Sequence, residues 1–221
     1  MNRCFWMVGC LVMLAVLGCD NKPQQGEADT SQTKTFGPEG MNTAGMGRPA
    51  DIENINPVIA VKFIGKHKGD DPKPRHVTLS MAEAQMHMPG GKFLAMDTLR
   101  IGFYVNTLDV DPAASGLGAE EAVKLRDHLK GPDFFNVKQY PTAEFDAKSI
   151  KLNEDGTGEI TGTFKMLTQS QELTIPVTHN AEKKLLEAKF ELDRTKFGMT
   201  YGVENVAEMV EVQISLDGSK G

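Results

Sequence analysis

Cysteine is nearly absent from the sequence, since all three cysteines, Cys4, Cys10 and Cys19, lie among the first 19 of its 221 residues. The remainder can form no disulfide and has no thiol nucleophile, so it must fold around its own hydrophobic core. Long apolar runs are also lacking, because the most apolar stretch, residues 4–17, has only 14 residues. A membrane-spanning helix needs about 18 to 20, so a retained transmembrane helix is disfavoured.

Excess positive charge is missing as well. The sequence has 24 Lys and Arg against 30 Asp and Glu, which gives a formal net charge of −6, and the basic residues are not clustered. This composition argues against nucleic-acid binding and against electrostatic docking to anionic lipid headgroups. The Gly-x-Ser-x-Gly pattern of a serine nucleophile does not occur either, and we expect no catalytic activity.

The first residues are typical of an export signal: a basic start is followed by an apolar run that ends at Val16-Leu17-Gly18-Cys19. These four residues resemble the bacterial lipobox, which implies removal of residues 1–18 as a lipoprotein signal peptide. Cys19 would then be the first mature residue and would carry fatty-acyl chains such as palmitate. Because two or three acyl chains hold a protein stably on a bilayer, we expect an exported protein anchored by lipid to the periplasmic face of the bacterial envelope.

Residues 19–51 follow as a polar segment rich in Gly, Pro, Ser, Thr and Gln, with Phe36 as the one aromatic residue. Such a composition cannot bury enough apolar surface to order itself, and it predicts a flexible tether. Residues 52–221 have the length of one domain.

Alternation of apolar and polar residues dominates this domain and predicts strands that are apolar on one face. The clear strands lie near residues 59–63, 99–105, 143–147, 160–166, 173–177, 188–192 and 210–216, and weaker candidates near 77–88 and 93–96 bring the number to about eight. One helix is predicted at residues 118–131. An all-β chain of this kind can form a sandwich or a closed antiparallel barrel, and closure removes the exposed edges. We expect an eight-stranded barrel with the short helix closing one end.

Several motifs carry a family resemblance. Arg126-Asp127-His128-Leu129, Asp133-Phe134-Phe135, and Tyr140-Pro141 followed by Phe145 resemble the central signature of the YceI-like family. GTFKMLTQSQELTIPV (residues 162–177) and FELDRTKFGMTYG (residues 190–202) are similar to its downstream segments. The resemblance implies a lipocalin-like antiparallel barrel, exported in bacteria, whose apolar tunnel binds a polyisoprenoid lipid non-covalently and without catalysis or a cofactor.

An eight-stranded barrel is just wide enough to be filled by side chains or to hold one small ligand. Ala143, Ala147, Gly162 and Ala188 share strand faces with large aromatic residues and would leave room between them. The candidate ligand-lining residues are Phe63, Ile101, Phe103, Val105, Phe134, Phe135, Tyr140, Phe145, Phe164, Phe190, Leu192 and Phe197. In an extended segment only one of the adjacent Phe134 and Phe135 would point inward.

Two polar residues are candidates for the tunnel mouth, His128 and Arg194. Each also has a structural interpretation: His128 or Asp127 would bond to backbone at the end of the barrel, and Arg194 would fix the turn that contains Gly198.

Two other functions are open. Met86-His87-Met88 offers soft ligands that suit copper, but in a strand the two methionines face opposite the histidine. A barrel filled by its own side chains would instead serve as an interaction or stress module. The sequence leaves the oligomeric state open, a homodimer included.

Overall fold

The computed structural model describes residues 52–220, so the predicted signal peptide, Cys19 and the tether lie outside the described residues. Within them the chain forms one antiparallel sheet of eleven strands, in the order β1-β4-β5-β7-β8-β9-β10-β11-β2-β3-β6. The strands are β1 (Ile52–Ile55), β2 (Val58–Gly65), β3 (Arg75–Leu79), β4 (Ala82–Pro89), β5 (Thr98–Phe103), β6 (Leu108–Val110), β7 (Ala143–Leu152), β8 (Thr157–Met166), β9 (Gln169–Asn180), β10 (Leu185–Asp193) and β11 (Met209–Asp217).

The described residues thus contain eleven strands where the sequence predicts about eight, because the predicted run 77–88 is divided into β3 and β4 and because β1 and β6 lie outside every predicted strand. Asn56 and Pro57 separate β1 from β2, and proline has no N–H to donate to a ladder. Ser80 and Met81 separate β3 from β4. A 3₁₀ turn, η2 (Val105–Thr107), separates β5 from β6.

The weak strand candidate at residues 93–96 is wrong. This segment forms the 3₁₀ helix η1 (Phe93–Ala95), in which Met96 N–H donates to the carbonyl of Phe93. Phe93 and Met96 are both buried. A spacing of three residues brings both side chains to one side of a 3₁₀ turn, which explains the burial without alternation.

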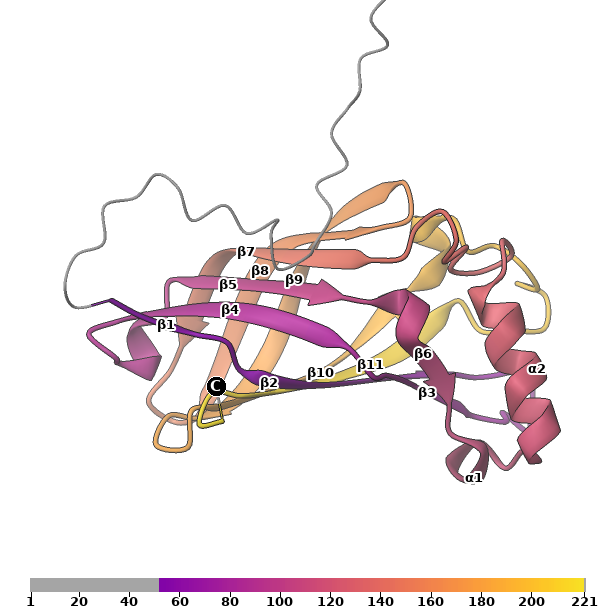
Figure 1. The fold of residues 1–221 in the computed structure, drawn as a ribbon, viewed down its shortest axis with the longest axis horizontal. Helices are drawn as coiled ribbons and strands as arrows, with labels where there is room; N and C mark the ends of the chain where they lie inside the picture. The colour runs from indigo at the N-terminus through magenta and orange to yellow at the C-terminus, as the bar shows by residue number, and fades with distance from the viewer. Residues whose placement is uncertain (1–51, 221) are drawn as a thin grey trace, which may run out of the picture. The chain divides into compact units, whose positions relative to one another are not determined.

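The sheet is curled into a half-barrel (Figure 1). Its inner face is lined by apolar side chains. Register shows how the inward rows are built: Phe190 pairs with Val212, Val212 with Phe63, and Phe63 with Val77 across four strands. Because successive residues of a strand point to opposite faces, these rows place the alternating apolar residues on one concave surface.

The predicted helix is present as α2 (Ala119–Lys130), preceded by a short α1 (Pro112–Ser115) that the sequence did not suggest. Gly118 N–H donates to the Glu121 carboxylate at 3.0 Å, which caps the start of α2, and Gly131 follows its end. Both helices lie at the same end of the sheet (Figure 1). In the part of the chain that the structure describes, every helix is too short or too polar to cross a membrane.

Candidate functional site

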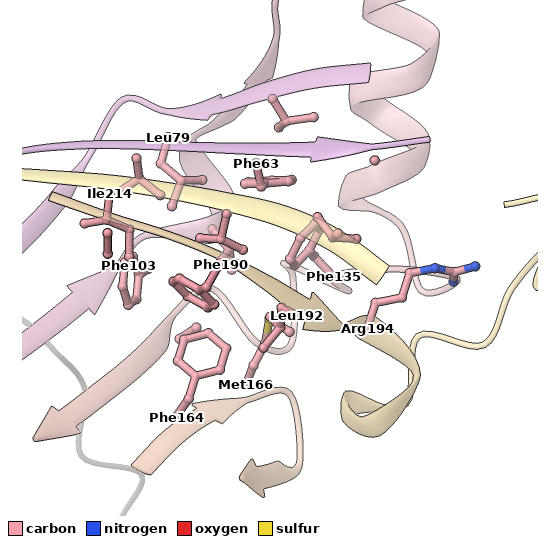
Figure 2. Close-up of a pocket in the computed structure, with 18 of the residues that line it drawn as sticks. Phe63, Leu79, Phe103, Phe135, Phe164, Met166, Phe190, Leu192, Arg194 and Ile214 are labelled. Atoms are coloured by element: carbon pink, nitrogen blue, oxygen red, sulfur yellow. The ribbon is translucent and has the colours of Figure 1, made fainter. Parts of the chain in front are cut away.

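A cavity of about 430 Å³ lies on the concave side of the sheet. Its wall is almost entirely apolar and is contributed by eight strands, β2, β3, β5 and β7 to β11, together with α2 and the turns near it. In Figure 2 the side chains of Phe103, Phe164, Phe190 and Ile214 lie close together around this space. The site is therefore a hollow inside the sheet.

The aromatic residues of the wall are evidence that the interior is not filled. Phe63, Phe164 and Phe190 point to the inner face, yet each is only half-buried. Side chains in a close-packed core are normally covered on all sides. Part of the surface of these three rings faces the cavity instead.

Ten of the twelve predicted ligand-lining residues contribute to the cavity wall. They are Phe63, Ile101, Phe103, Val105, Phe134, Phe135, Phe145, Phe164, Phe190 and Leu192. Phe197 and Tyr140 do not line it. Phe197 is buried behind the wall, with its ring centroid 5.4 Å from that of Phe164, and Tyr140 is half-buried.

The adjacent Phe134 and Phe135 both line the cavity, because the extended segment in which only one ring would point inward is not present here. They lie in a tight turn, not a strand: Phe134 N–H donates to Gly131 O and Phe135 N–H to Leu129 O. Asn136 continues the turn with a φ of 43°. Adjacent side chains do not alternate between two faces in such a backbone. The centroid of the Phe135 ring lies 5.6 Å from that of the Phe63 ring.

The small residues divide into two groups. Ala143 and Ala188 line the cavity and leave room in it, as expected. Ala147 and Gly162 do not line it. A Cβ atom on Gly162 would lie 2.5 Å from the Asp146 carbonyl oxygen and 2.6 Å from Cζ of Phe145, so this glycine makes room for the Phe145 ring.

Other residues of the wall were not singled out from the sequence. On the strands they include Val61, Leu79, Ile175 and Ile214, and on α2 they include Leu125 and Leu129. The strand residues follow the same alternation as the predicted ones, so this pattern could have identified them.

Arg194 lies in the cavity wall, and its side chain holds the chain that follows it, as the structural interpretation predicts. Its guanidinium donates to four backbone carbonyls, those of Met199, Tyr201, Val206 and Ala207. The side chain is only 4% exposed, and burial lowers the pKa of Arg194 although Glu208 and Asp193 oppose the shift. The segment from Met199 to Ala207 is thereby held around one end of the cavity.

His128 does not line the cavity, and its partner is a side chain instead of the expected backbone group. Its Nε2 lies 3.1 Å from a carboxylate oxygen of Asp133. Its ring also meets those of Phe134 and Tyr201 edge to face, at 5.1 Å between centroids in both pairs. The neighbouring Asp127 accepts from the Arg126 guanidinium. These contacts give His128 a structural role beside the cavity end.

The Met86-His87-Met88 segment lies in β4, where the register is regular and the residues alternate. Met86 and Met88 are buried inside, whereas His87 is on the other face and its Nδ1 contacts the Asp97 carboxylate. The three side chains therefore do not converge on one point. Among residues 52–220, no cluster of three or more His, Asp or Glu side chains is arranged to hold a metal.

The YceI-like domain model matches residues 66–218 of this chain. A UPF0312 protein of Pseudomonas putida is 28% identical over 121 residues, and the match covers 51% of this chain and 62% of that relative's own length.

Two solved structures show the same fold. BcnA of Burkholderia cenocepacia superposes with a TM-score of 0.58 at 21% identity, over 72% of this chain and 94% of that chain. The YCEI protein of Campylobacter jejuni superposes with a TM-score of 0.51 at 13% identity, over 83% and 96%. At these identities the likeness concerns the fold alone.

Proposed function

The chain belongs to the YceI-like domain family, and from this premise we propose that it binds one apolar lipid chain, an isoprenoid, inside the cavity without catalysing a reaction. The observation that carries this proposal is the apolar wall, which eight strands contribute in common. A chain without polar groups needs no hydrogen-bonding partners along such a wall. Each of its CH₂ groups gains about 0.8 kcal/mol when it leaves water.

The distribution of polar residues supports the same function. Ligand sites are mostly apolar with a few polar groups that orient the ligand. Here the charged residues of the wall come from the segments that meet near α2. Lys66 directly follows β2, and Arg75 is the first residue of β3. Glu121 is on α2, and Arg194 is the first residue of the 3₁₀ helix η3 (Arg194–Phe197). One end of the cavity is therefore suited to a polar head group and the remainder to an apolar chain.

We also propose that the curled sheet closes into a barrel of eight strand runs, with α2 over one end. The support is the pairing: β2 pairs with β3 while β1 pairs with β4, and only Ser80 and Met81 separate β3 from β4. Leu125 and Leu129 of α2 belong to the wall. Closure predicts that amides of β1 and β6 exchange with solvent as slowly as those of β4 and β3, and rapid exchange confined to β1 and β6 would indicate an open sheet.

For localisation we propose the bacterial envelope, with the chain anchored by lipid at Cys19. The support is the resemblance of residues 16–19 to a lipobox. Intact mass measurement and membrane fractionation test this: the wild type should carry a diacylglyceryl group and sediment with membranes, and Cys19→Ala should do neither. A wild-type protein that retains residues 1–18 would overturn the anchor.

Lipid extraction tests the binding function directly. The full-length chain is purified from a bacterial host in mild detergent, extracted with organic solvent, and the extract is analysed by mass spectrometry beside that of an unrelated lipoprotein. We expect an apolar lipid in near-stoichiometric amount in the first extract alone. Repeated extraction of no specific lipid would favour the ligand-free interaction module instead.

A further inference from the structure

We propose that the occupant is an anionic amphiphile with a single chain of about 17 carbon atoms, whose head group binds Lys66 and Arg75. This inference rests on the proposed function and adds the length and the charge of the ligand. It is carried by the volume of the cavity, by its closed end and by the charges at its other end.

Volume sets the size of the ligand. An engineered apolar cavity of about 150 Å³ binds benzene, which has six carbons. By the same proportion, the cavity of about 430 Å³ accommodates about 17 carbon atoms. That is the size of a common fatty-acyl chain or of three to four isoprene units.

The cavity ends at a floor of leucines, so a longer chain has no exit there. Leu99, Leu186 and Leu216 line it and are 2%, 2% and 0% exposed. Leu186 and Leu216 are directly paired between β10 and β11. The floor therefore consists of side chains that are covered on nearly all sides.

A second layer lies beyond this floor. Met86 pairs with Leu99 between β4 and β5, and Met88, Phe93 and Met96 are buried with it in the same core. These four side chains are at most 4% exposed, and none of them lines the cavity. The packed layer makes the cavity blind at this end, which limits the length of any ligand.

The end of the cavity near α2 carries a local excess of positive charge. Gly65 pairs with Arg75, so Lys66 and Arg75 lie together where β2 ends and β3 begins, and both line the cavity. Arg75 Nη1 donates to the Ser115 carbonyl at 2.9 Å, which fixes the guanidinium at the wall. The third cation of the wall, Arg194, is engaged by four carbonyls.

Negative charge at this end is weaker. Glu121 is the one carboxylate of the wall, and it accepts the hydrogen bond from Gly118 N–H at 3.0 Å. The protein as a whole has a net charge of −6, so the charge of this part of the wall is opposite in sign to the net charge of the protein. A charged group near the low-dielectric wall of a cleft attracts an opposite charge more strongly than it would in water. A carboxylate or a phosphate head group fits this end.

Binding of defined ligands to the delipidated full-length protein tests the proposal. Fatty acids of 12, 16, 20 and 24 carbons are titrated beside the matched alcohols, and farnesyl phosphate beside farnesol distinguishes isoprenoid from straight chains. We expect affinity to rise up to about 16 to 18 carbons and then to level off or fall. The anionic forms should bind about five- to tenfold more tightly than the alcohols.

Two variants test the head-group site. Lys66→Met with Arg75→Gln should abolish the preference for the anion: the affinity for the acid should fall to that for the matched alcohol, because both positive charges of this part of the wall are removed. Lys73→Met is the control, since Lys73 is an exposed lysine in the same loop that does not line the cavity. It should keep the preference of the wild type.

A third variant tests the floor. Leu216→Ala removes three carbons from the cavity wall, so the preferred chain should lengthen by about three carbons. Leu108→Ala is the matched control, because Leu108 is equally buried but lies outside the wall. It should lower stability to a similar extent without changing the preferred length.

The outcomes separate the two proposals. Equal affinity for acids and alcohols would overturn the anionic head group, and affinity that still rises at 24 carbons would overturn the length limit, while lipid binding itself would stand. Failure of every chain to bind would overturn the proposed function and this inference together.

Discussion

A substitution that fills the cavity with a larger side chain distinguishes a hollow interior from a packed one. Ala188 lies in β10, lines the cavity and is 8% exposed. Its inward neighbours Leu186 and Phe190 also line the cavity. Ala188→Phe would project an additional aromatic ring into this space without altering the outer face.

The expected magnitude follows from the cavity volume. The six added carbons need about 150 Å³, which is about a third of the 430 Å³ present. The chain that fits should shorten by about six carbons, and at about 0.8 kcal/mol per carbon the loss is about 5 kcal/mol, or more than 10³-fold in affinity. Stability should change by less than about 1 kcal/mol, because a ring that enters a void displaces no neighbour, whereas overpacking a filled core costs about 1 to 3 kcal/mol.

Isothermal titration with a 16-carbon fatty acid and urea unfolding of the ligand-free protein give the two quantities. Glu187→Phe is the control, because Glu187 precedes Ala188 on the same strand but is exposed on the outer face. It should bind as the wild type does. An Ala188→Phe protein that binds the acid normally, or that loses about 3 kcal/mol of stability, would refute the hollow interior.

Three further substitutions test the framework around the cavity. Arg194→Met leaves four backbone carbonyls without their donor, and it should lower the free energy of unfolding by about 3 to 5 kcal/mol; a loss below about 1 kcal/mol in urea titration would contradict this role. Gly162→Ala places a Cβ 2.5 Å from the Asp146 carbonyl oxygen and should lower the free energy of unfolding by about 1 to 3 kcal/mol in the same assay. An unchanged free energy of unfolding would show that β7 and β8 can move apart at little cost. The Thr195 hydroxyl, with help from its N–H, lowers the pKa of Asp193 below its usual 3.8. The contribution of this carboxylate to the free energy of unfolding is therefore complete above about pH 4 and is lost as pH falls through the folded-state pKa. Asp193→Asn should thus be less stable than the wild type at about pH 7, and the difference in stability should shrink in acid. A difference in stability that does not depend on pH would argue against this coupling.

The strand faces could be predicted because burial on a curved sheet alternates with the residue number. Phe63, Phe164 and Phe190 each sit in an alternating run, and all three face the cavity. The family motifs were equally informative, since the YceI-like match spans residues 66–218. Local pattern and motif order together were enough for the all-β class of the fold and for ten residues of the wall.

Features that depend on distant or non-repetitive backbone could not be predicted. Phe134 and Phe135 both face inward because they lie in a turn, which Asn136 continues with a positive φ. Unlike a strand or a helix, such a turn has no repeating pattern of side-chain directions that the sequence could reveal. The four carbonyls bound by Arg194 belong to residues 5 to 13 positions further along the chain. No local pattern predicts that this segment folds back onto one guanidinium.

The role of a small residue also depends on what lies opposite. Ala188 and Gly162 look alike in the sequence, as small residues among aromatic ones. Ala188 leaves space in the cavity, whereas the space above Gly162 is taken by Phe145 and by the backbone of β7. The strand register, which the sequence does not determine, decides between the two.

A crystal structure of the full-length protein, purified without removal of lipid, would show directly whether the cavity holds a lipid chain. We expect continuous density for one apolar chain among Phe103, Phe164 and Phe190, beginning near Lys66 and Arg75 and ending at the leucine floor. An interior that is filled by the protein's own side chains and leaves no void for a chain would contradict this expectation.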